Sequence, residues 1–378
     1  MTYNFKYVSK HLRSLIEPAS EKSHRFEEEL GYRVFRNAYV APYVHWNSSI
    51  GCVIDKDGRT VKDSECIEWK ENADYYDLST SVSDHKKIIF LGFLLNGFGH
   101  SYTDDLRKLW FLSTDKYSEL YNAGYELVYI TSWNKPIPQH VLDIIRFAGI
   151  NLQEARHITV LTQFDEVVIP DSCFRATDYG RVYSFEYEQL IDNIIHAIPC
   201  ADVVFPKVYF TRTHYVTNPN KEQGEKEIER VFCKLGYRVI GPEEYSVVEQ
   251  LQMIRNCSHF AATEGSVAHL SLFCKENTDV VIINKANYLN FHQVMVNEFA
   301  NLNVTYIEAH HSSEANKDYP WWGPFYLCVN HFLEHYAHRP ILYIPYWLRY
   351  SYWKYTRNIL YKCINRIKKC IKWIRSYL

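Results

Sequence analysis

The sequence lacks the features that would place it across a membrane, outside the cell or in a zinc-binding class. No run of 18 apolar residues occurs among its 378 residues, so no membrane span is expected. Its first residues contain no apolar stretch followed by a small-residue cleavage site, so no secretory signal is expected. The ten cysteines include no closely spaced pair, which disfavours zinc motifs and indicates free thiols in a reducing cytoplasm.

Acidic residues are missing from the end of the chain. None follows Glu334, whereas nine Lys or Arg residues lie between Ile341 and Leu378. Because the whole chain has a formal net charge of −2, the remainder is distinctly acidic. An acidic body argues against DNA or RNA as the main partner, since both require a cationic face.

The basic segment 341–378 has the pattern of an amphipathic helix. Leu360, Ile364, Ile367, Ile371 and Ile374 fall on one stripe, and basic residues and tryptophans fall around it. Such a helix is typical of segments that lie on an anionic membrane surface. We therefore expect a tail that holds the protein on the inner face of the cell membrane. A terminal helix docked on the protein, or one that binds a partner protein, is the alternative.

The composition predicts a folded protein of two domains. Hydrophobic residues make up 47% and charged residues 23% of the chain, and its length can support two cores. No internal repeat or low-complexity run is present. We expect an N-terminal α/β domain over residues 1–200, a C-terminal α/β domain over 201–340, and the tail over 341–378.

The stretch Val203–Lys285 carries the clearest fold signal. Four short apolar runs alternate with three segments of helical period, which predicts βαβ units and a parallel sheet. The runs are Val208–Phe210, Tyr237–Ile240, His259–Ala261 and Val280–Ile283. Ligands of such sheets bind beyond the carboxyl ends of the strands. Thr211 and Arg212 follow the first run, and residues 263–266 (Thr-Glu-Gly-Ser) follow the third, which indicates an anion-binding site.

The N-terminal half predicts a second parallel sheet. Ile88–Leu95 is a continuous apolar run of the kind found in buried parallel strands. Further strands are expected over residues 34–43, 50–64, 126–132, 157–161 and 166–170, with helices over 138–147 and 186–198. Residues 1–30 are expected to form a polar lead-in with one helix that ends near Gly31.

The segment after Ile88–Leu95 contains a candidate acid–base pair. Gly97, Gly99 and His100 follow the strand, and a helix is expected from about Ser101. His100 and Asp104 are four residues apart and would share one face of that helix. A carboxylate beside a histidine can orient the imidazole for general-base catalysis. The alternative is an ordinary helix start, where Ser and Asp residues serve as caps.

Two other patterns are compatible with metal binding but favour simpler structures. Asp55 and Asp57 form an Asp-x-Asp motif, yet with Gly58 they fit a hairpin turn better. His331, His335 and His338 recur at helical spacing, but they lack the order of a metalloprotease motif, so a solvated helix face is favoured. No metal or cofactor is therefore expected.

Taken together, these motifs resemble family 61 glycosyltransferases, which include bacterial enzymes of capsular and surface polysaccharide synthesis. The family's N-terminal signature is a strand followed by Gly-His, then Asp, then Leu. Gly99, His100, Asp104 and Leu106 match it.

The family's C-terminal signature is matched at several further positions. The matching residues are Arg212, Glu225, Gly236–Tyr237, Glu249–Gln250 and Gly265–Ser266. Two positions depart from it: Gly224 replaces an Asn, and Glu264 replaces a His. The likeness covers about residues 34–285.

The resemblance implies an inverting enzyme of the GT-B type, with two Rossmann-like domains that face each other across a cleft. The C-terminal domain would bind a UDP- or GDP-linked sugar, and the N-terminal domain a glycan or lipid-linked glycan acceptor. His100 or Asp104 would be the catalytic base. The residues expected to bind the donor are Arg212, Glu249, Gly265, Ser266 and His269.

Two alternative functions are compatible with the sequence. One is a polysaccharide pyruvyltransferase-like enzyme, which also uses a two-domain α/β cleft but requires phosphoenolpyruvate. The other is a non-catalytic glycan-binding or assembly protein on a degenerate transferase fold, for which the departures at Gly224 and Glu264 are the reason.

Overall fold

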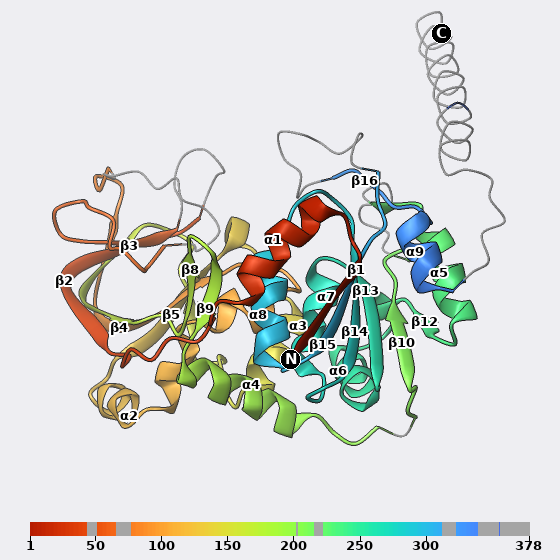
Figure 1. Cartoon of the computed structure of the whole chain (residues 1–378). Coiled ribbons are helices and arrows are strands. Elements are labelled where there is room, and N and C mark those ends of the chain that lie inside the picture. The colour runs from red at the N-terminus through yellow and green to blue at the C-terminus, as the bar shows by residue number, and fades with distance from the viewer. Residues whose placement is uncertain are drawn as a thin grey trace, which may run out of the picture.

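The computed structural model describes residues 1–43, 51–65, 77–201, 203–214, 222–311 and 323–338, together with Tyr355. Within these residues the chain forms two six-stranded sheets with helices around them (Figure 1). The mixed α/β architecture with parallel strands confirms that part of the predicted fold class. The predicted amphipathic tail, 341–378, lies outside the described residues apart from Tyr355. No helix among the described residues is long and apolar enough to cross a membrane.

The first sheet has the strand order β3-β2-β7-β4-β5-β6. Its central strand β4 (Val82–Leu94) is parallel to β7 (Thr162–Pro170) and β5 (Glu126–Thr131), and β5 is parallel to β6 (Arg156–His157). The parallel prediction is wrong for one edge, because β2 (Tyr32–Ala41) runs antiparallel to both β7 and β3 (Cys52–Ile54). Neighbouring parallel strands require a crossover connection of about a dozen or more residues, and the connection between β2 and β3 is shorter than that.

The second sheet is entirely parallel, with the order β1-β15-β14-β13-β10-β12. The four predicted strands are confirmed as β10 (Lys207–Phe210), β12 (Arg238–Ile240), β13 (His259–Thr263) and β14 (Asp279–Asn284), and β15 (Asn303–Glu308) extends them. The intervening helices are α5 (Glu225–Lys234), α6 (Val247–Asn256) and the short α7 (Ser266–His269). Arg212, Glu264 and Lys285 therefore follow strands at the same edge of this sheet.

The N-terminal segment belongs to the second sheet, not to a polar lead-in. Strand β1 (Thr2–Tyr7) pairs with β15, and helix α1 (Lys10–Ser20) packs on helix α8 (Phe291–Phe299) (Figure 1). The chain then passes to the hairpin of β8 (Phe174–Thr177) and β9 (Gly180–Tyr183), where Phe26 N donates a hydrogen bond to the Tyr183 carbonyl at 2.9 Å. Residues 2–26, the N-terminal strap, thus connect the two halves.

The remaining elements complete the layers around the sheets. They are α2 (Asp115–Asn122), α3 (Gln139–Phe147), α4 (Phe185–Ala197), α9 (His331–Tyr336), the strand pair β11 (Glu222–Gln223) and β16 (Phe325–Tyr326), and the 3-10 turns η1 (His100–Tyr102), η2 (Asp104–Leu106), η3 (Leu109–Ser113), η4 (Ser132–Asn134), η5 (Pro242–Glu244) and η6 (Leu270–Phe273). One hydrophobic cluster runs through both halves and includes Ile89 of β4, Ile194 of α4, Leu251 of α6 and Val294 of α8. A shared core holds the two sheets in a defined relation. The proposed division into domains at residue 200 remains a prediction.

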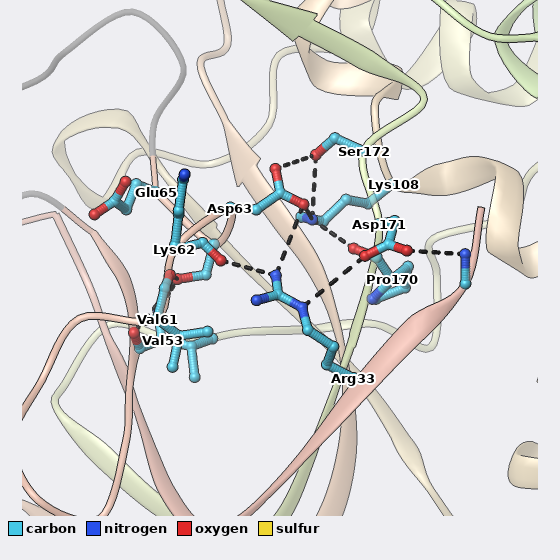
Figure 2. Close-up of polar contacts among 12 residues, drawn as sticks. Arg33, Val53, Val61, Lys62, Asp63, Glu65, Lys108, Pro170, Asp171 and Ser172 are labelled. Atoms are coloured by element: carbon cyan, nitrogen blue, oxygen red, sulfur yellow. Dashed lines mark hydrogen bonds and ion pairs between the residues drawn. The ribbon is translucent and has the colours of Figure 1, made fainter. Parts of the chain in front are cut away.

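The N-terminal half contains a buried lysine, Lys108. The Lys108 side chain is fully buried, and its Nζ donates to the Pro170 carbonyl at 2.5 Å and to Ser172 Oγ at 3.3 Å. Figure 2 shows these contacts together with Asp63, whose Oδ2 lies 3.2 Å from Lys108 Nζ. Burial lowers the pKa of Lys108 to about 8, although Asp63 opposes the shift. This Lys108 cluster (Asp63, Lys108, Pro170, Ser172) joins three separate segments of the N-terminal half.

The cysteines and the Asp55–Gly58 segment agree with the simpler sequence interpretations. All seven cysteines within the described residues are free thiols. Asp55 Oδ1 accepts hydrogen bonds from the backbone N–H groups of Asp57 and Arg59, each at 2.9 Å, and Gly58 has a φ of 84°. The predicted hairpin turn is therefore confirmed. The residues that the structure describes contain no group of three or more His, Cys, Asp or Glu side chains arranged to hold a metal ion.

Candidate active site

A cavity of about 810 Å³ lies between the two halves of the chain. From the N-terminal half, Gly99, His100, Thr103 and the β8–β9 hairpin line it, and α1 adds His11 and Leu15. From the C-terminal half, the lining residues are Arg212, Gly265, Ser266, His269, Lys285 and the segment 287–292. The cavity opens at the carboxyl edge of the second sheet, where ligands of parallel sheets bind. Six of the seven predicted site residues line this cavity or contact a lining residue; Glu249 does not.

Two cations converge on Gly265 at the bottom of the cavity. Gly265 has a φ of +129°, and a Cβ there would lie 3.3 Å from Lys285 Nζ and 3.7 Å from Arg212 Nη1. A side chain at this position would be strained and would fill the space in front of both cations. The glycine therefore leaves room for a ligand group of opposite charge. Arg212 was predicted from the sequence, whereas Lys285 was not.

Glu222 holds these two cations in place. Its Oε1 accepts from Lys285 Nζ at 3.0 Å, and its Oε2 lies 3.5 Å from Arg212 Nε. Lys285 Nζ also lies 4.2 Å from the centre of the Phe325 ring. Burial lowers the pKa of Lys285, and the negative charge of Glu222 works against that shift. Arg212 and Lys285 thus place two cations side by side at the cavity, which suits a diphosphate.

Glu264 turns away from the cavity, although it precedes Gly265. Its Oε1 accepts from the Asn290 backbone N–H at 3.0 Å, and its Oε2 accepts from Asn284 Nδ2 at 3.1 Å. The side chain is fully buried, and burial raises its pKa to about 7 despite the attraction of Lys285. Glu264 thus fixes the segment 284–290, which forms one wall of the cavity, and does not meet the ligand itself.

The raised pKa of Glu264 predicts a pH dependence of stability. Its folded pKa of about 7 exceeds the reference value of 4.5, so the unfolded chain releases this proton first as the pH rises. Glu264 therefore favours the folded state fully below pH 4.5 and loses this contribution as the pH approaches 7. The shift is worth on the order of 3 kcal/mol. In urea unfolding, Glu264→Gln is expected to flatten the fall in stability between pH 5 and 7.5, whereas equal slopes for variant and wild type would contradict this.

His100 and Asp104 form the predicted pair on the opposite wall. His100 Nδ1 lies 2.6 Å from Asp104 Oδ2, and the Thr103 hydroxyl donates to the same oxygen at 2.9 Å. The His100 side chain is 35% exposed and lines the cavity, whereas the Asp104 side chain is 1% exposed beneath it. The predicted helix is two 3-10 turns, because Thr103 (φ −121°, ψ −97°) interrupts it between η1 and η2. The contact nevertheless forms.

Arg181 and His292 surround the same carboxylate and were not predicted. Arg181 Nε donates to His292 Nε2 at 3.0 Å and lies 3.8 Å from Asp104 Oδ1. His292 Nε2 lies 3.6 Å from Asp104 Oδ2. Burial alone would raise the pKa of Asp104, but its histidine neighbours, His100 first, hold it well below the usual value. Asp104 is therefore an anion that fixes the orientation of the His100 ring.

The two walls meet where Gly99 contacts Ser266. A Cβ on Gly99 would lie 2.7 Å from Ser266 Oγ and 3.2 Å from its Cα. Beside this contact the Tyr102 hydroxyl donates to the Ser266 carbonyl at 2.6 Å. The close approach requires glycine, and it brings the His100 wall next to the Gly265 wall. A ligand bound at the cations is therefore within reach of His100.

His269 and Glu249 have supporting positions. His269 lines the cavity, but burial lowers its pKa to about 3, and its Nδ1 lies 2.9 Å from Gln293 Oε1. It is therefore a neutral histidine held by α8. Glu249 lies on the exposed start of α6, where its carboxylate accepts from the Ser246 N–H at 2.8 Å and forms a capping box. The structure does not bring Glu249 to the cavity.

Residues 98–281 match the family model of glycosyltransferase 61. The matched segment includes His100, Asp104, Arg181, Arg212 and Gly265 and ends before Lys285 and His292. A search of curated proteins finds no match. The family match supports a glycosyltransferase, and with it glycosyl transfer as the general class of activity.

Proposed function

From the family match and the cavity, we propose that the protein is an inverting, metal-independent glycosyltransferase. It moves a sugar from a nucleotide-sugar to a hydroxyl of a surface or capsular glycan. The observation that carries the proposal is the pairing, in one cavity, of two convergent cations with a histidine–carboxylate pair. This arrangement provides a site for the departing diphosphate and a base for the attacking hydroxyl.

The nucleotide-sugar binds with its diphosphate at Arg212 and Lys285. Both side chains are held by Glu222, so few conformations are lost when the diphosphate arrives. The small volume of Gly265 lets phosphate oxygens approach both cations. Positive charge placed in advance stabilises the negative charge that develops on the leaving diphosphate. In this proposal the side-chain cations supply that charge without a metal ion.

The reaction is one displacement at the anomeric carbon. His100 accepts the proton of the acceptor hydroxyl as that oxygen bonds to the anomeric carbon. The bond from the carbon to the diphosphate oxygen breaks on the opposite face, and the nucleoside diphosphate leaves with the electron pair. Asp104 keeps Nδ1 of His100 engaged at 2.6 Å, which leaves Nε2 as the basic atom and stabilises the resulting imidazolium.

The proposed arrangement of domains follows the GT-B type. The first sheet and its helices, residues 1–200, serve the acceptor, and residues 201–340 bind the donor. Support comes from the His100 wall on one side of the cavity and the cation wall on the other. Strand β1 is an exception in this scheme, since it pairs within the second sheet.

The basic segment 341–378 is proposed to hold the enzyme at the inner face of the cell membrane, where lipid-linked acceptors are found. Support comes from the sequence alone: nine basic residues, no acidic residue and a stripe of apolar residues. The test is flotation with vesicles of phosphatidylglycerol and phosphatidylcholine. The full chain should float with the vesicles, and a chain that ends at Pro340 should not. Equal flotation of the two would contradict the proposal.

Nucleotide binding tests the donor site directly. Lys285→Met is expected to weaken the binding of UDP or GDP at least tenfold, because one of two cations at the diphosphate is lost. Lys275→Met, an exposed lysine outside the cavity, is the matched control and should bind like the wild type. Titration calorimetry measures both, with circular dichroism to confirm folding.

Thermal unfolding of the wild type in the presence of candidate ligands separates the alternatives. If neither UDP, GDP nor CMP raises the melting temperature of the wild type, the glycosyltransferase proposal fails. Stabilisation by phosphoenolpyruvate without any by nucleotides would favour the pyruvyltransferase alternative. Nucleotide binding without turnover of any nucleotide-sugar would favour the non-catalytic one.

A further inference from the structure

An exposed aromatic ring lies at the rim of the cavity. Phe291 is the first residue of α8, lines the cavity and is 42% exposed. Its position is fixed by the N-cap residue Asn290, whose side chain accepts from the His292 N–H at 3.1 Å. Phe291 thus exposes apolar surface to the cavity. Helix α8 lies beyond the segment matched by the family model.

The β8–β9 hairpin packs directly against Phe291. Gly180 has a φ of +139°, and a Cβ there would lie 3.1 Å from the Phe291 Cβ. The turn of the hairpin carries Thr177 and Asp178, which line the same cavity. The Arg181 carbonyl forms a hydrogen bond of 2.7 Å with His24 Nδ1, so the N-terminal strap helps to hold the hairpin in place. Phe291 and Asp178 therefore line the same cavity, and the close contact at Gly180 joins the hairpin to the start of α8.

The chemistry of this rim suits a neutral sugar and not a phosphate. A pyranose has an apolar C–H face that stacks on an aromatic ring, and neighbouring hydroxyls that donate to a carboxylate. Asp178 would repel a diphosphate, whereas Arg212 and Lys285 attract one, so charge separates the two ends of the cavity. This part of the cavity lies near the His100–Asp104 pair. Arg181, the residue after Gly180 in the hairpin, is 3.8 Å from Asp104.

We propose that Phe291 and Asp178 form the subsite for the acceptor sugar. The ring of Phe291 carries the apolar face of a pyranose, and Asp178 accepts hydrogen bonds from two of its hydroxyls. A further hydroxyl of that sugar then faces His100. This inference rests on the proposed glycosyltransferase function, since that reaction places an acceptor glycan beside the base.

The test is saturation-transfer NMR with a panel of methyl glycosides in the presence of UDP. At least one glycoside should show transfer with the wild type, and Phe291→Ala should lower its affinity about tenfold. Phe291→Tyr should restore binding. Phe185→Ala is the matched control, because Phe185 is also the first residue of its helix, is 53% exposed and lies outside the cavity. Asp178→Asn should weaken the same glycoside.

The outcomes separate this inference from the proposed function. UDP affinity should be the same for wild type and Phe291→Ala. If Phe291→Ala weakens UDP as well, the ring stacks on the nucleobase and the acceptor subsite is wrong. If UDP binds but no methyl glycoside binds, or if glycoside binding is unchanged in Phe291→Ala, the inference fails and the donor site stands. If a glycoside binds through Phe291 and no nucleotide binds, the sugar subsite at Phe291 is supported and the glycosyltransferase proposal fails.

Discussion

Replacing His100 with alanine is expected to lower kcat by about 10²–10⁴-fold, because it removes the base that we propose for the acceptor proton. Asp104→Asn should lower kcat less than His100→Ala, since the ring remains but its orientation is no longer held by the 2.6 Å contact. UDP affinity should change little in either variant, because the proposed diphosphate site is at Arg212 and Lys285. Initial rates with a nucleotide-sugar and its acceptor measure the first effect, and calorimetry the second.

The chain offers a matched control for this experiment. His85 Nδ1 lies 3.2 Å from Asp165 Oδ1, so it forms a second histidine–carboxylate pair, but on the surface of the first sheet and outside the cavity. His85→Ala should keep the wild-type kcat. If His100→Ala also retained more than about half of the wild-type rate, His100 could not be the base, and another residue of the cavity would have to accept the proton.

Lys108→Met is expected to destabilise the fold by about 2–4 kcal/mol without any change at the cavity. Removal of one partner from a buried ion pair costs about 3–5 kcal/mol. We expect about 2–4 kcal/mol and not this full cost, because the Asp63 side chain is 33% exposed and water partly screens its charge. The Pro170 carbonyl, which accepts from Lys108 at 2.5 Å, also loses its donor. Urea unfolding measures the change, and Lys116→Met, on the exposed face of α2, is the control.

The pH dependence identifies the cause of this effect. The pKa of Lys108 is about 8 in the folded state against 10.5 as reference, so between these values the unfolded chain binds the extra proton. Wild-type stability should therefore gain a contribution as the pH rises from 8 to 10.5, and Lys108→Met should lack it. A variant as stable as Lys116→Met at pH 7 would show that the Lys108 cluster carries no net stability.

The second sheet could be predicted because its signals are local. Each of β10, β12, β13 and β14 is a short apolar run, and each connection has a helical period, so the order of elements follows from the sequence. Strand β1 was missed although its residues alternate between polar and aromatic types and helix α1 follows it. Its partner β15 is about 300 residues away, so no local signal places it in the second sheet. The prediction of a polar lead-in over residues 1–30 was wrong for this reason.

The candidate site was predictable where contacts are close in the sequence. His100 and Asp104 are four residues apart, and their contact forms in two 3-10 turns as it would in a helix. Arg181 and His292 reach Asp104 only through the fold, as Lys285 reaches Glu222, and no local motif marks them. The direction of Glu264 was also beyond sequence reasoning, because it depends on Asn284 and the Asn290 N–H, which supply donors on the side away from the cavity.

The N-terminal strap sets the order in which the chain can complete its fold during synthesis. Strand β1 leaves the ribosome well before its partner β15, which follows 301 residues later, as the contact between Thr2 and Asn303 shows. At ordinary rates of translation this delay is about 15–60 s. The first sheet has all its strands in residues 32–170 and can form in that interval, whereas β1 stays an unpaired edge in a nascent chain. A chaperone that recognises extended segments would therefore find a target in strand β1 until β15 is made.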